Sequence, residues 1–417
     1  MKIVVDLTNK CNLSCKHCGA TKLKDCPEGV MLNFFKELNS DIIDSVDLLG
    51  GEPFLHPNIF EIINILNKKG ILINIITNGQ FNDDFINRIS QNNISSIFVS
   101  IDGLEKDNDN LRGKGSFKKA DNFLKKIIKN NNRFHNISFI GVNTVINVYN
   151  KDNLIPFMLY LNGFGENIGW QINPLLGEGK AAENRDLFIK NEDEIDILEN
   201  IAKNVNLNKN LIVSLNYNLP LILEYLNKRY STEFPVKGYQ CDACISTIYC
   251  DEFGDLYPCR KYRKKILSVE SMERFQETSK EFLKLSLIEN HYIGCDNCAY
   301  TGICNNCPLE KERQRPELCQ VCENRYVEYI NSFKNCIYMV SKDIILENLK
   351  NKLVLISIKN DKKYEYDVNG KEIYSLINGK NTVMSISQKL DIDLFDVSYF
   401  LYNELIKSNI RILNNSI

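Results

Sequence analysis

Hydrophobic residues follow two alternating patterns along the first half of the chain. Short β-branched runs predict strands, and apolar residues at every third or fourth position predict helices. The expected strands are Lys2–Leu7, Val46–Leu49, Ile71–Thr77, Ser96–Ile101, Ile137–Ile146 and Ile168–Asn173. The expected helices are Leu32–Leu38, Ile59–Asn67, Asp83–Gln91, Lys118–Lys129, Leu154–Leu161 and Glu192–Asn204. Six such units predict a parallel sheet with right-handed crossovers.

The predicted fold class is therefore α/β over residues 1–215. Six units are too few for a closed eight-stranded barrel, which leaves an open sheet or, as we expect, a partial (β/α)6 barrel. In either arrangement, functional groups belong at the carboxyl ends of the strands.

The second half of the chain changes character twice. Residues 235–340 are rich in cysteine and loops, with too little apolar surface for a core of their own, so we expect this region to need metal to fold. A helix is expected over RYVEYINSFKNCIYM, from Arg325 to Met339. Residues 345–417 predict a small separate domain: a hairpin turning at Asn360-Asp361, then three helical patterns from Lys371, Met384 and Leu394.

Composition narrows the class of protein. The chain has 417 residues, is 44% hydrophobic and 25% charged, and carries a net charge of −2, which is ordinary globular composition. This balance argues against a chain-wide nucleic-acid or membrane-surface footprint. No apolar run approaches about 18 residues, so no membrane span is expected. The N-terminus, MKIVVDLTNK, lacks a secretory apolar region, and we expect a cytoplasmic protein.

Cysteine is the unusual residue type. The chain has 15 cysteines, an odd number, and no export signal, which disfavours a disulfide framework. They gather in two fields, four between Cys11 and Cys26 and ten between Cys241 and Cys322, with Cys336 after them. This pattern predicts metal or iron–sulfur ligation.

The first field follows the first predicted strand directly. Cys11, Cys15 and Cys18 have the spacing CxxxCxxC. Three thiolates can hold three corners of a 4Fe-4S cubane and leave one iron open to bind and reduce another molecule. A structural zinc loop with a fourth ligand elsewhere is the alternative.

With this triad, the sequence resembles the radical S-adenosylmethionine (radical SAM) enzymes. Gly50-Gly51-Glu52-Pro53 follows the second strand, as that family's GGEP motif does. The resemblance implies that this backbone and acid meet the methionyl amino group of S-adenosylmethionine. The residue types agree, because glycines permit close approach of the backbone and a carboxylate suits an ammonium. The catalytic residues it implies are Cys11, Cys15 and Cys18.

Further cofactor-binding candidates lie at other strand ends. Ser100 resembles a family position that contacts the cofactor, and Asp102 can cap the same turn. Arg112 resembles the family's RG loop and can pair a carboxylate, or be a solvated loop charge. Asn143 can reach the ribose, or be satisfied locally. His17 matches a position that is usually aromatic in the family and implies packing against the adenine.

One more segment carries the resemblance. Gly177-Glu178-Gly179-Lys180-Ala181, after the sixth strand, resembles the family's cofactor-proximal loop.

The second cysteine field resembles the SPASM extension, which carries auxiliary 4Fe-4S clusters. Cys241-x12-Gly254-x4-Cys259 matches its pattern, whereas Cys304-x2-Cys307 is one residue short. The resemblance implies a first auxiliary cluster on Cys241, Cys244, Cys259 and Cys307. It implies a second on Cys295, Cys298 and Cys304, with Cys319 or Cys322 as the last ligand. Zinc ribbons are the alternative on spacing alone, and Cys250, in the strand-like run STIYC, is expected to be a small buried hydrophobe.

Residues 345–417 resemble the PqqD-like winged-helix domain that binds leader peptides, through YDVNGKEIYSLINGKNTVMSISQKL and VSYFLYNELIKSNI. A DNA-binding winged helix is the alternative. It is disfavoured because the segment has no concentrated positive charge.

Together the resemblances imply an enzyme that matures a ribosomally made precursor peptide. It would cleave S-adenosylmethionine reductively, abstract hydrogen from the peptide and install a thioether or carbon–carbon crosslink. Three 4Fe-4S clusters, a precursor peptide with a leader and an electron donor such as flavodoxin or ferredoxin are implied. The alternatives are a sulfatase-maturating oxidation, disfavoured because Arg260 stands where that family has an acid, and a non-catalytic iron–sulfur or zinc sensor.

Overall fold

The structure is a computed structural model whose described residues form two compact units. It describes residues 1–20, 29–165, 167–207, 210–217, 220–235 and 246–260 and, further on, 321–322, 324–325, 327–329, 337–341, 344–349, 352–357, 362–406 and 410–412. The first unit is Met1–Cys319 and the second is Gln320–Ile417.

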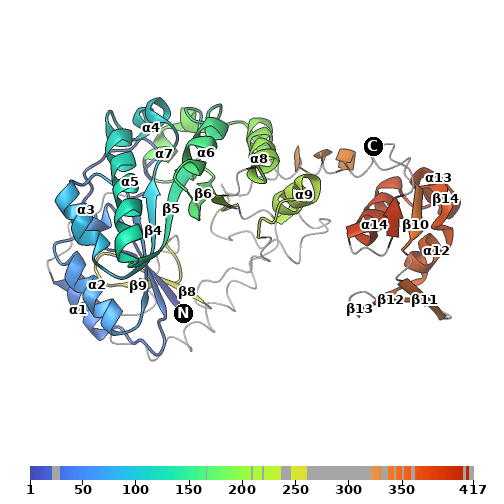
Figure 1. Cartoon of the computed structure of the whole chain (residues 1–417), viewed down its shortest axis with the longest axis horizontal. Helices are drawn as coiled ribbons and strands as arrows, with labels where there is room; N and C mark the ends of the chain where they lie inside the picture. Colours follow the sequence, from blue (N-terminus) through green and yellow to red (C-terminus); the bar gives the residue numbers. More distant parts are fainter. Residues whose placement is uncertain are drawn as a thin grey trace. The chain divides into compact units, whose positions relative to one another are not determined.

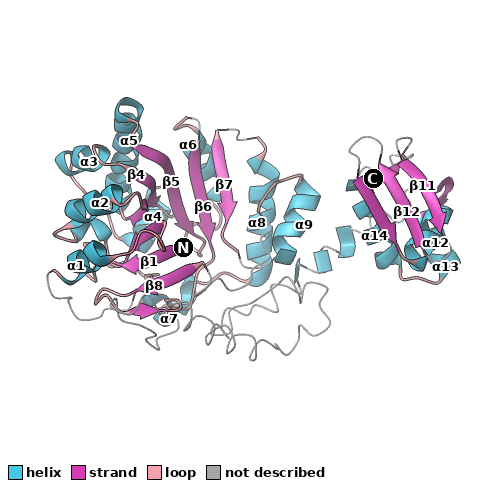
Figure 2. Cartoon of the chain, turned by 90° about the horizontal axis from the view of Figure 1, so that it is seen from below, coloured by secondary structure: helices cyan, strands magenta, loops and turns pink. Residues whose placement is uncertain are grey.

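A nine-stranded sheet organises the first unit, in the order β7-β6-β5-β4-β3-β2-β1-β8-β9 (Figures 1 and 2). Neighbouring strands from β7 to β8 are parallel, and β9 is antiparallel to β8. The strands are β1 (Lys2–Asp6), β2 (Ser45–Leu49), β3 (Leu72–Thr77), β4 (Ile94–Ser100), β5 (Ile137–Val145), β6 (Ile168–Asn173), β7 (Leu211–Leu215), β8 (Thr247–Cys250) and β9 (Leu256–Tyr257).

The helices of this unit cross over between consecutive strands. They are α1 (Val30–Glu37), α2 (Ile59–Lys68), α3 (Asp83–Ser90), α4 (Glu105–Arg112), α5 (Ser116–Phe134), α6 (Leu154–Asn162), the short α7 (Lys180–Glu183), α8 (Asn191–Val205) and α9 (Pro220–Tyr230). Figure 1 shows α1, α2, α3 and α5 along one face of the sheet. This arrangement confirms the predicted α/β fold with a partial (β/α)6 barrel.

The six predicted strands are confirmed to within two residues at each end, and the six helices are confirmed as well. The strand-like run STIYC is confirmed as β8, and the structure adds β7, β9, α4, α7 and α9, which the hydrophobic pattern did not predict. The strands among them are two to five residues long, so they carry little periodicity.

The two faces of the sheet differ in polarity because side chains alternate along each strand. One face carries fully buried aliphatic side chains, such as Ile3 and Val5 of β1 and Ile75 of β3. On the other face, Asn74 donates to Asp47 Oδ1 at 2.8 Å and accepts from Ser96 Oγ at 2.7 Å. A polar inner face of this kind leaves the barrel interior suited to polar ligands.

Among the described residues of the second unit are two three-stranded sheets and the helices α12, α13 and α14. The sheets have the orders β11-β12-β13 and β14-β10-β15. Their strands are β10 (Ile337–Val340), β11 (Ile344–Leu349), β12 (Lys352–Ser357), β13 (Lys362–Tyr366), β14 (Asn378–Thr382) and β15 (Ile410–Ile412), and the helices are α12 (Val368–Leu376), α13 (Val383–Leu390) and α14 (Leu394–Ile406).

The hairpin and the three helices predicted for this unit are confirmed by β12, β13 and α12–α14. The turn at Asn360-Asp361 lies outside the described residues. The helix expected to reach Met339 is wrong at its end, because Ile337–Val340 form strand β10. That strand pairs with β14 and β15, so tertiary pairing overrides the local helical pattern.

Candidate functional site

The loop Cys11–Cys18 leaves the carboxyl end of β1 and carries three free thiols. Burial raises the pKa of Cys15 to about 11, and Asp102 and the other two thiols add to that rise while Arg112 opposes it. Burial also raises the pKa of Cys11, with a contribution from Cys18. The thiolate forms of Cys11 and Cys15 are thus disfavoured, so a cationic metal group beside them would stabilise their charged form.

The spacing of these thiols does not suit a single ion. In the ranges that the structure describes, no three His, Cys, Asp or Glu side chains gather as they would around one metal ion. Three free thiols on one loop are the donor set that can hold three irons of a 4Fe-4S cubane and leave the fourth iron open.

Three other segments hold the cysteine loop. Lys16 N donates to the carbonyl of Leu111, at the end of α4, at 2.9 Å. The carbonyl of Cys18 accepts from Lys180 N at 2.9 Å. Asn78, after β3, donates to Asn12 Oδ1 at 2.7 Å and to Cys11 Sγ at 3.7 Å. The loop is therefore positioned by the ends of β3, α4 and β6 together.

The loop after β6 comes close to the third cysteine. Gly179 has φ 53° and ψ −130°, and an added Cβ would lie 2.5 Å from the Cys18 carbonyl oxygen. Lys180 Nζ donates to Ser14 Oγ at 2.5 Å, and Asn184 donates to the Lys16 carbonyl at 3.1 Å. Glycine is required here because this backbone conformation and this approach exclude a side chain.

The two glycines of the GGEP segment contact the chain that leads to Cys11. Gly50 has φ 112°, and its added Cβ would lie 2.5 Å from the Thr8 carbonyl oxygen. The Cβ of an alanine at Gly51 would overlap the backbone of Lys10. Gly51 N donates to the Thr8 carbonyl at 2.6 Å, and Glu52 N donates to the Lys10 carbonyl at 2.8 Å. These glycines thus align the cysteine loop as well as exposing backbone.

Glu52 is buried, with an exposed fraction of 1%. Its Oε1 accepts from Thr77 Oγ1 at 2.8 Å and from Phe54 N at 3.3 Å, and its Oε2 accepts from Asn78 N at 2.7 Å. Burial raises the pKa of Glu52 to about 7 despite these donors. Pro53 follows as the first residue of a short 3-10 helix, Pro53–Leu55. The carboxylate therefore joins the ends of β2 and β3.

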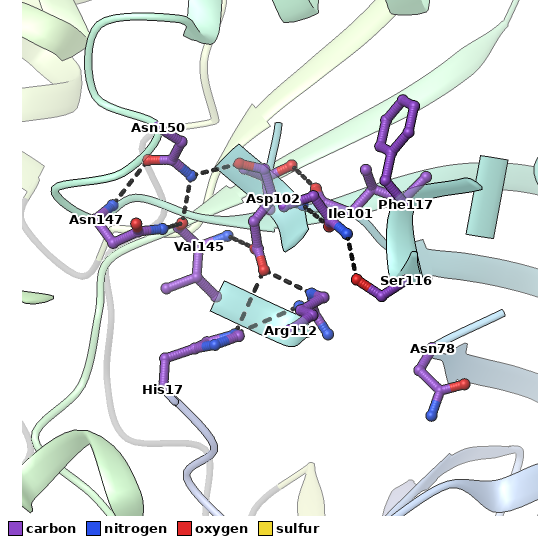
Figure 3. A network of polar contacts seen from close by, with 12 residues as sticks. His17, Asn78, Ile101, Asp102, Arg112, Ser116, Phe117, Val145, Asn147 and Asn150 are labelled. Carbon is purple, nitrogen blue, oxygen red and sulfur yellow. Dashed lines mark hydrogen bonds and ion pairs between the residues drawn. The ribbon is translucent and has the colours of Figure 1, made fainter. Parts of the chain in front are cut away.

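Asp102 and Arg112 form a buried ion pair beside the cysteine loop (Figure 3). Arg112 Nε lies 2.6 Å from Asp102 Oδ2, and Val145 N, at the end of β5, donates to Asp102 Oδ1 at 2.8 Å. The guanidinium holds the pKa of Asp102 below its usual range. Arg112 is 9% exposed, so its alternative as a solvated loop charge is wrong. It pairs a carboxylate of this chain, and Asp102 joins strands instead of merely capping a turn.

His17 lies against this ion pair, as Figure 3 shows. Its Nε2 is 3.4 Å from Arg112 Nη2 and 3.6 Å from Asp102 Oδ2. Burial lowers the pKa of His17 to about 4, so the imidazole is neutral at pH 7. The imidazole thereby links the cysteine loop to the end of β4.

Two weaker candidates lie at neighbouring strand ends. Ser100 ends β4, is 7% exposed and pairs in register with Asn143 of β5. Asn143 is half-buried, and its Oδ1 accepts from Asn173 Nδ2 at 2.7 Å. Both residues lie near the carboxyl ends of their strands, at the same edge of the sheet as the cysteine loop.

Three residues of the second cysteine field fall in described ranges. Cys259 follows β9 and is half-buried, Cys322 is buried, and Cys250 in β8 is 0% exposed. The expectation that Cys250 is a small buried hydrophobe is confirmed. The other candidate ligands lie outside the described residues: Cys241, Cys244, Cys295, Cys298, Cys304, Cys307 and Cys319.

Arg260, the residue after Cys259, lies beside β1. Its Nε is 3.4 Å from Asp6 Oδ2, which also accepts from Tyr249 OH at 2.7 Å. Sequence reasoning missed this pair and the role of Asn78. The polar run Thr77-Asn78-Gly79 after the third strand was the available signal for Asn78.

None of the helices in the described ranges combines the length and apolar composition that crossing a bilayer demands.

Comparisons with known proteins agree with this site. Residues 5–154 match the Radical SAM superfamily model. The sporulation killing factor maturation protein SkfB of Bacillus subtilis is 32% identical over 133 residues, covering 30% of this chain and 32% of SkfB. The antilisterial bacteriocin subtilosin biosynthesis protein AlbA of the same species is 23% identical over 349 residues, covering 78% of this chain and 71% of AlbA.

Solved structures share the fold. SuiB of Streptococcus suis bound to S-adenosylmethionine matches with a TM-score of 0.59 and 16% identity, over 76% of this chain and 77% of SuiB. The enzyme anSMEcpe, with bound AdoMet and the Cp18Cys peptide, matches with a TM-score of 0.58 and 18% identity, over 79% of this chain and 96% of that one.

Residues 5–154 of the first unit therefore belong to the radical SAM superfamily. Membership implies one 4Fe-4S cluster and S-adenosylmethionine as cofactors. The chain spans about a third of SkfB and 71% of AlbA.

Proposed function

We propose that this protein is a peptide maturase that uses S-adenosylmethionine to crosslink a ribosomally made precursor peptide. The observation that carries the proposal is the docking of the three-thiol loop on Gly50-Gly51 at the carboxyl edge of a parallel sheet. The peptide substrate is supported by two relatives, whose names describe a maturation protein and a bacteriocin biosynthesis protein.

In this proposal, Cys11, Cys15 and Cys18 hold the cofactor-binding cluster. When bound, it supplies the electron that cleaves S-adenosylmethionine to methionine and a 5′-deoxyadenosyl radical. The chain contributes position and exclusion of water. The backbone at Gly50-Gly51-Glu52-Pro53 receives the methionyl amino group, and Glu52 adds negative charge near it.

The remaining cofactor contacts come from the neighbouring strand ends. Ser100, in register with Asn143, is proposed to contact the ribose, and His17 is proposed to pack against the adenine. Asn143 takes the local alternative to a ribose contact, because its Oδ1 accepts from Asn173 Nδ2. Arg112 is not proposed to contact the cofactor, because its guanidinium is paired with Asp102. It supports the cysteine loop instead.

Two auxiliary 4Fe-4S clusters complete the proposed cofactor set. Their ligands are Cys241, Cys244, Cys259 and Cys307 for one, and Cys295, Cys298, Cys304 and either Cys319 or Cys322 for the other. Three cubanes require about 12 irons per chain. Anaerobically reconstituted protein should hold about that amount, whereas stoichiometric zinc with about four irons would contradict the auxiliary assignment.

The favoured product is a thioether, with a carbon–carbon crosslink as the second candidate. For a thioether, bound S-adenosylmethionine would supply the acceptor for one hydrogen atom of a peptide carbon, and the substrate cysteine thiol would lose one proton. The auxiliary clusters, held by the second cysteine field, would supply the acceptor for the remaining electron as the carbon–sulfur bond forms. A sulfatase-maturating oxidation is less favoured, because the residue after Cys259 is Arg260, which pairs with Asp6.

The proposed leader-binding domain, residues 345–417, lies within the second unit. Strand β13 lies at one side of the sheet β11-β12-β13, and Lys363 and Glu365 on it are exposed while Tyr364 and Tyr366 are half-buried. The Tyr366 hydroxyl donates to buried Glu404 at 2.8 Å, which fixes β13 on α14. An edge strand can receive an extended peptide as a further strand.

The proposal retains three domains, with a radical SAM core over 1–215, an auxiliary-cluster region over 235–340 and the leader-binding domain over 345–417. It also includes a flavodoxin or ferredoxin as electron donor, and action in the cytoplasm.

Co-expression tests this function. The chain would be expressed together with each small open reading frame that adjoins its gene, and the peptides would be analysed by mass spectrometry. A thioether or carbon–carbon crosslink lowers the peptide mass by two hydrogens, and the Cys11, Cys15 and Cys18 alanine variant should leave the mass unchanged. An unmodified peptide with the wild-type enzyme, purified with intact clusters, would contradict the proposed function.

A further inference from the structure

Four amide side chains lie together at the carboxyl ends of β5, β6 and β7. They are Asn143, Gln171, Asn173 and Asn216. Asn143 and Gln171 pair in register, and Asn216 N donates to the carbonyl of Ile172 at 2.8 Å. Asn143, Gln171 and Asn173 are half-buried and Asn216 is exposed, so the group borders open space at the edge that carries the cysteine loop.

A backbone carbonyl fixes the orientation of Asn173. Its Nδ2 donates to the Thr144 carbonyl at 3.2 Å and to Asn143 Oδ1 at 2.7 Å. Because a carbonyl only accepts hydrogen bonds, the NH2 group of Asn173 must face β5. Its Oδ1 consequently faces the other side, where it accepts from Asn216 Nδ2 at 2.8 Å and from Gln171 Nε2 at 3.4 Å.

Asn173 thereby sets which atom each neighbour has left to offer. The Oδ1 of Asn143 accepts from Asn173, so its NH2 group is left as a hydrogen-bond donor. Gln171 and Asn216 turn an NH2 group toward Asn173 and retain their oxygens as acceptors. The described part of the chain supplies no further hydrogen-bond partner for these three retained groups. The result is a donor on β5 and acceptors on β6 and β7.

We propose that this group, the amide row, binds a peptide group of the substrate. Asn143 would donate to the substrate carbonyl, and Gln171 or Asn216 would accept from the substrate N–H. This inference rests on the proposed peptide-modifying function and specifies where the peptide main chain is held. The row itself carries no charge, and a carboxylate or phosphate would face two acceptors for one donor, which disfavours an anionic ligand.

The place of the row suits this role. Asn143 pairs in register with Ser100, at the end of β4, so the row adjoins the strand ends that border the cysteine loop. A main chain held there would keep one substrate carbon at a constant position during hydrogen abstraction. Asn173 is a positioning residue in this arrangement, because it acts through its three neighbours.

The Asn173→Asp variant tests the row with almost no change in volume. An aspartate oxygen would replace Nδ2 and face the Thr144 carbonyl and Asn143 Oδ1. The Asn143 amide would then flip, so that its NH2 group donates to the aspartate and no longer faces the substrate. With the precursor peptide that the wild type modifies in co-expression as substrate, the KM for peptide should rise about tenfold or more while kcat changes little, since one or two hydrogen bonds are lost. Affinity for S-adenosylmethionine should be retained.

Asn204→Asp is the matched control. Its side chain is half-buried near the end of α8, and its Nδ2 donates to the Asn200 carbonyl at 2.8 Å. It should leave the KM for peptide unchanged. If Asn173→Asp folds poorly, Gln171→Ala removes one acceptor from the row and should raise KM in the same direction.

A second measurement separates this inference from the proposed function. N-acetylglycine methylamide contains two peptide groups and little else. It should show saturation-transfer NMR contact with the wild-type protein and a weaker signal with Asn173→Asp. Equal signals and an unchanged peptide KM would overturn the amide row. Weakened S-adenosylmethionine binding in the variant would also overturn it, because the row would then contact the cofactor ribose. Failure of the wild type to modify any peptide, with the probe signals as expected, would contradict the proposed function alone.

Discussion

Arg112 Nε lies 2.6 Å from Asp102 Oδ2, with the two side chains 9% and 0% exposed. This pair links the end of α4 to the turn after β4 and, through Val145 N, to the end of β5. Arg112 also lowers the pKa of Cys15 through its charge. A single buried ion pair thus supports the cysteine loop electrostatically and mechanically.

Removing one member of this pair should be costly. Arg112→Met or Asp102→Asn should lower the free energy of unfolding of the cluster-free protein by about 3–5 kcal/mol, because the partner's charge stays buried. The double variant should lose less than the sum. Urea denaturation measures each value. Lys125→Met, which breaks an exposed 2.6 Å pair with Asp121, is the control and should cost under about 1 kcal/mol. Equal losses in both pairs would contradict the structural role.

The raised pKa of Glu52 predicts a pH dependence of stability. Between about pH 4.5 and 7 the folded protein holds a proton on Glu52 that the unfolded chain has lost, so stability falls as pH rises through this window. The total effect is about 3 kcal/mol. Glu52→Gln should flatten this slope in denaturation experiments on the cluster-free protein. Glu61→Gln, at an exposed position of α2, should not, and identical slopes in both variants would refute the burial argument.

Gly51→Ala should displace the cysteine loop. The added Cβ would overlap the Lys10 backbone, whose carbonyl accepts from Glu52 N, while Gly51 N donates to the Thr8 carbonyl. We expect a marked loss of iron bound at the front cluster after anaerobic reconstitution, measured by electron paramagnetic resonance of the reduced protein. Gly70→Ala has open space around the new Cβ and strains only a backbone of φ 70°, so it should cost about 1–2 kcal/mol and retain the cluster. Full cluster occupancy in Gly51→Ala would contradict this reading.

The sequence predicted the βα units well because their apolar periods are local. It could not predict the contacts that hold the cysteine loop, since Lys16 meets Leu111, and Lys180 meets Cys18, across more than 90 residues of chain. The glycines of the GGEP segment illustrate the same limit. Their type indicated a close backbone approach, and the partner in the structure is the chain at Thr8 and Lys10.

The sequence also did not predict which polar side chains pair with one another. Arg112 was a carboxylate-binding candidate, but its partner Asp102 was expected only to cap a turn, because hydrogen-bond networks carry no periodicity. The helix expected through Met339 failed for a related reason: strand β10 exists through pairing with β14 and β15, which follow it by about 40 and 70 residues.

Removing the second unit should separate peptide binding from cofactor cleavage. Strand β10 pairs with β14 and β15, so the deletion should begin at residue 337 and leave no strand of that sheet behind. The truncated enzyme should bind the precursor peptide weakly and form little product. It should still cleave S-adenosylmethionine in the absence of peptide. Binding is measured by fluorescence anisotropy of a labelled leader. Normal affinity and processing in the truncated enzyme would contradict leader binding by this unit.

The most direct test of the central claim is the formation of 5′-deoxyadenosine by the reconstituted protein with S-adenosylmethionine and dithionite. The wild type should form it, and Cys250→Ala should too, because Cys250 is a buried residue of β8. The variant with Cys11, Cys15 and Cys18 replaced by alanine should form none while keeping a brown colour from its other clusters. Continued 5′-deoxyadenosine formation by that triple variant would show that the loop after β1 does not hold the catalytic cluster.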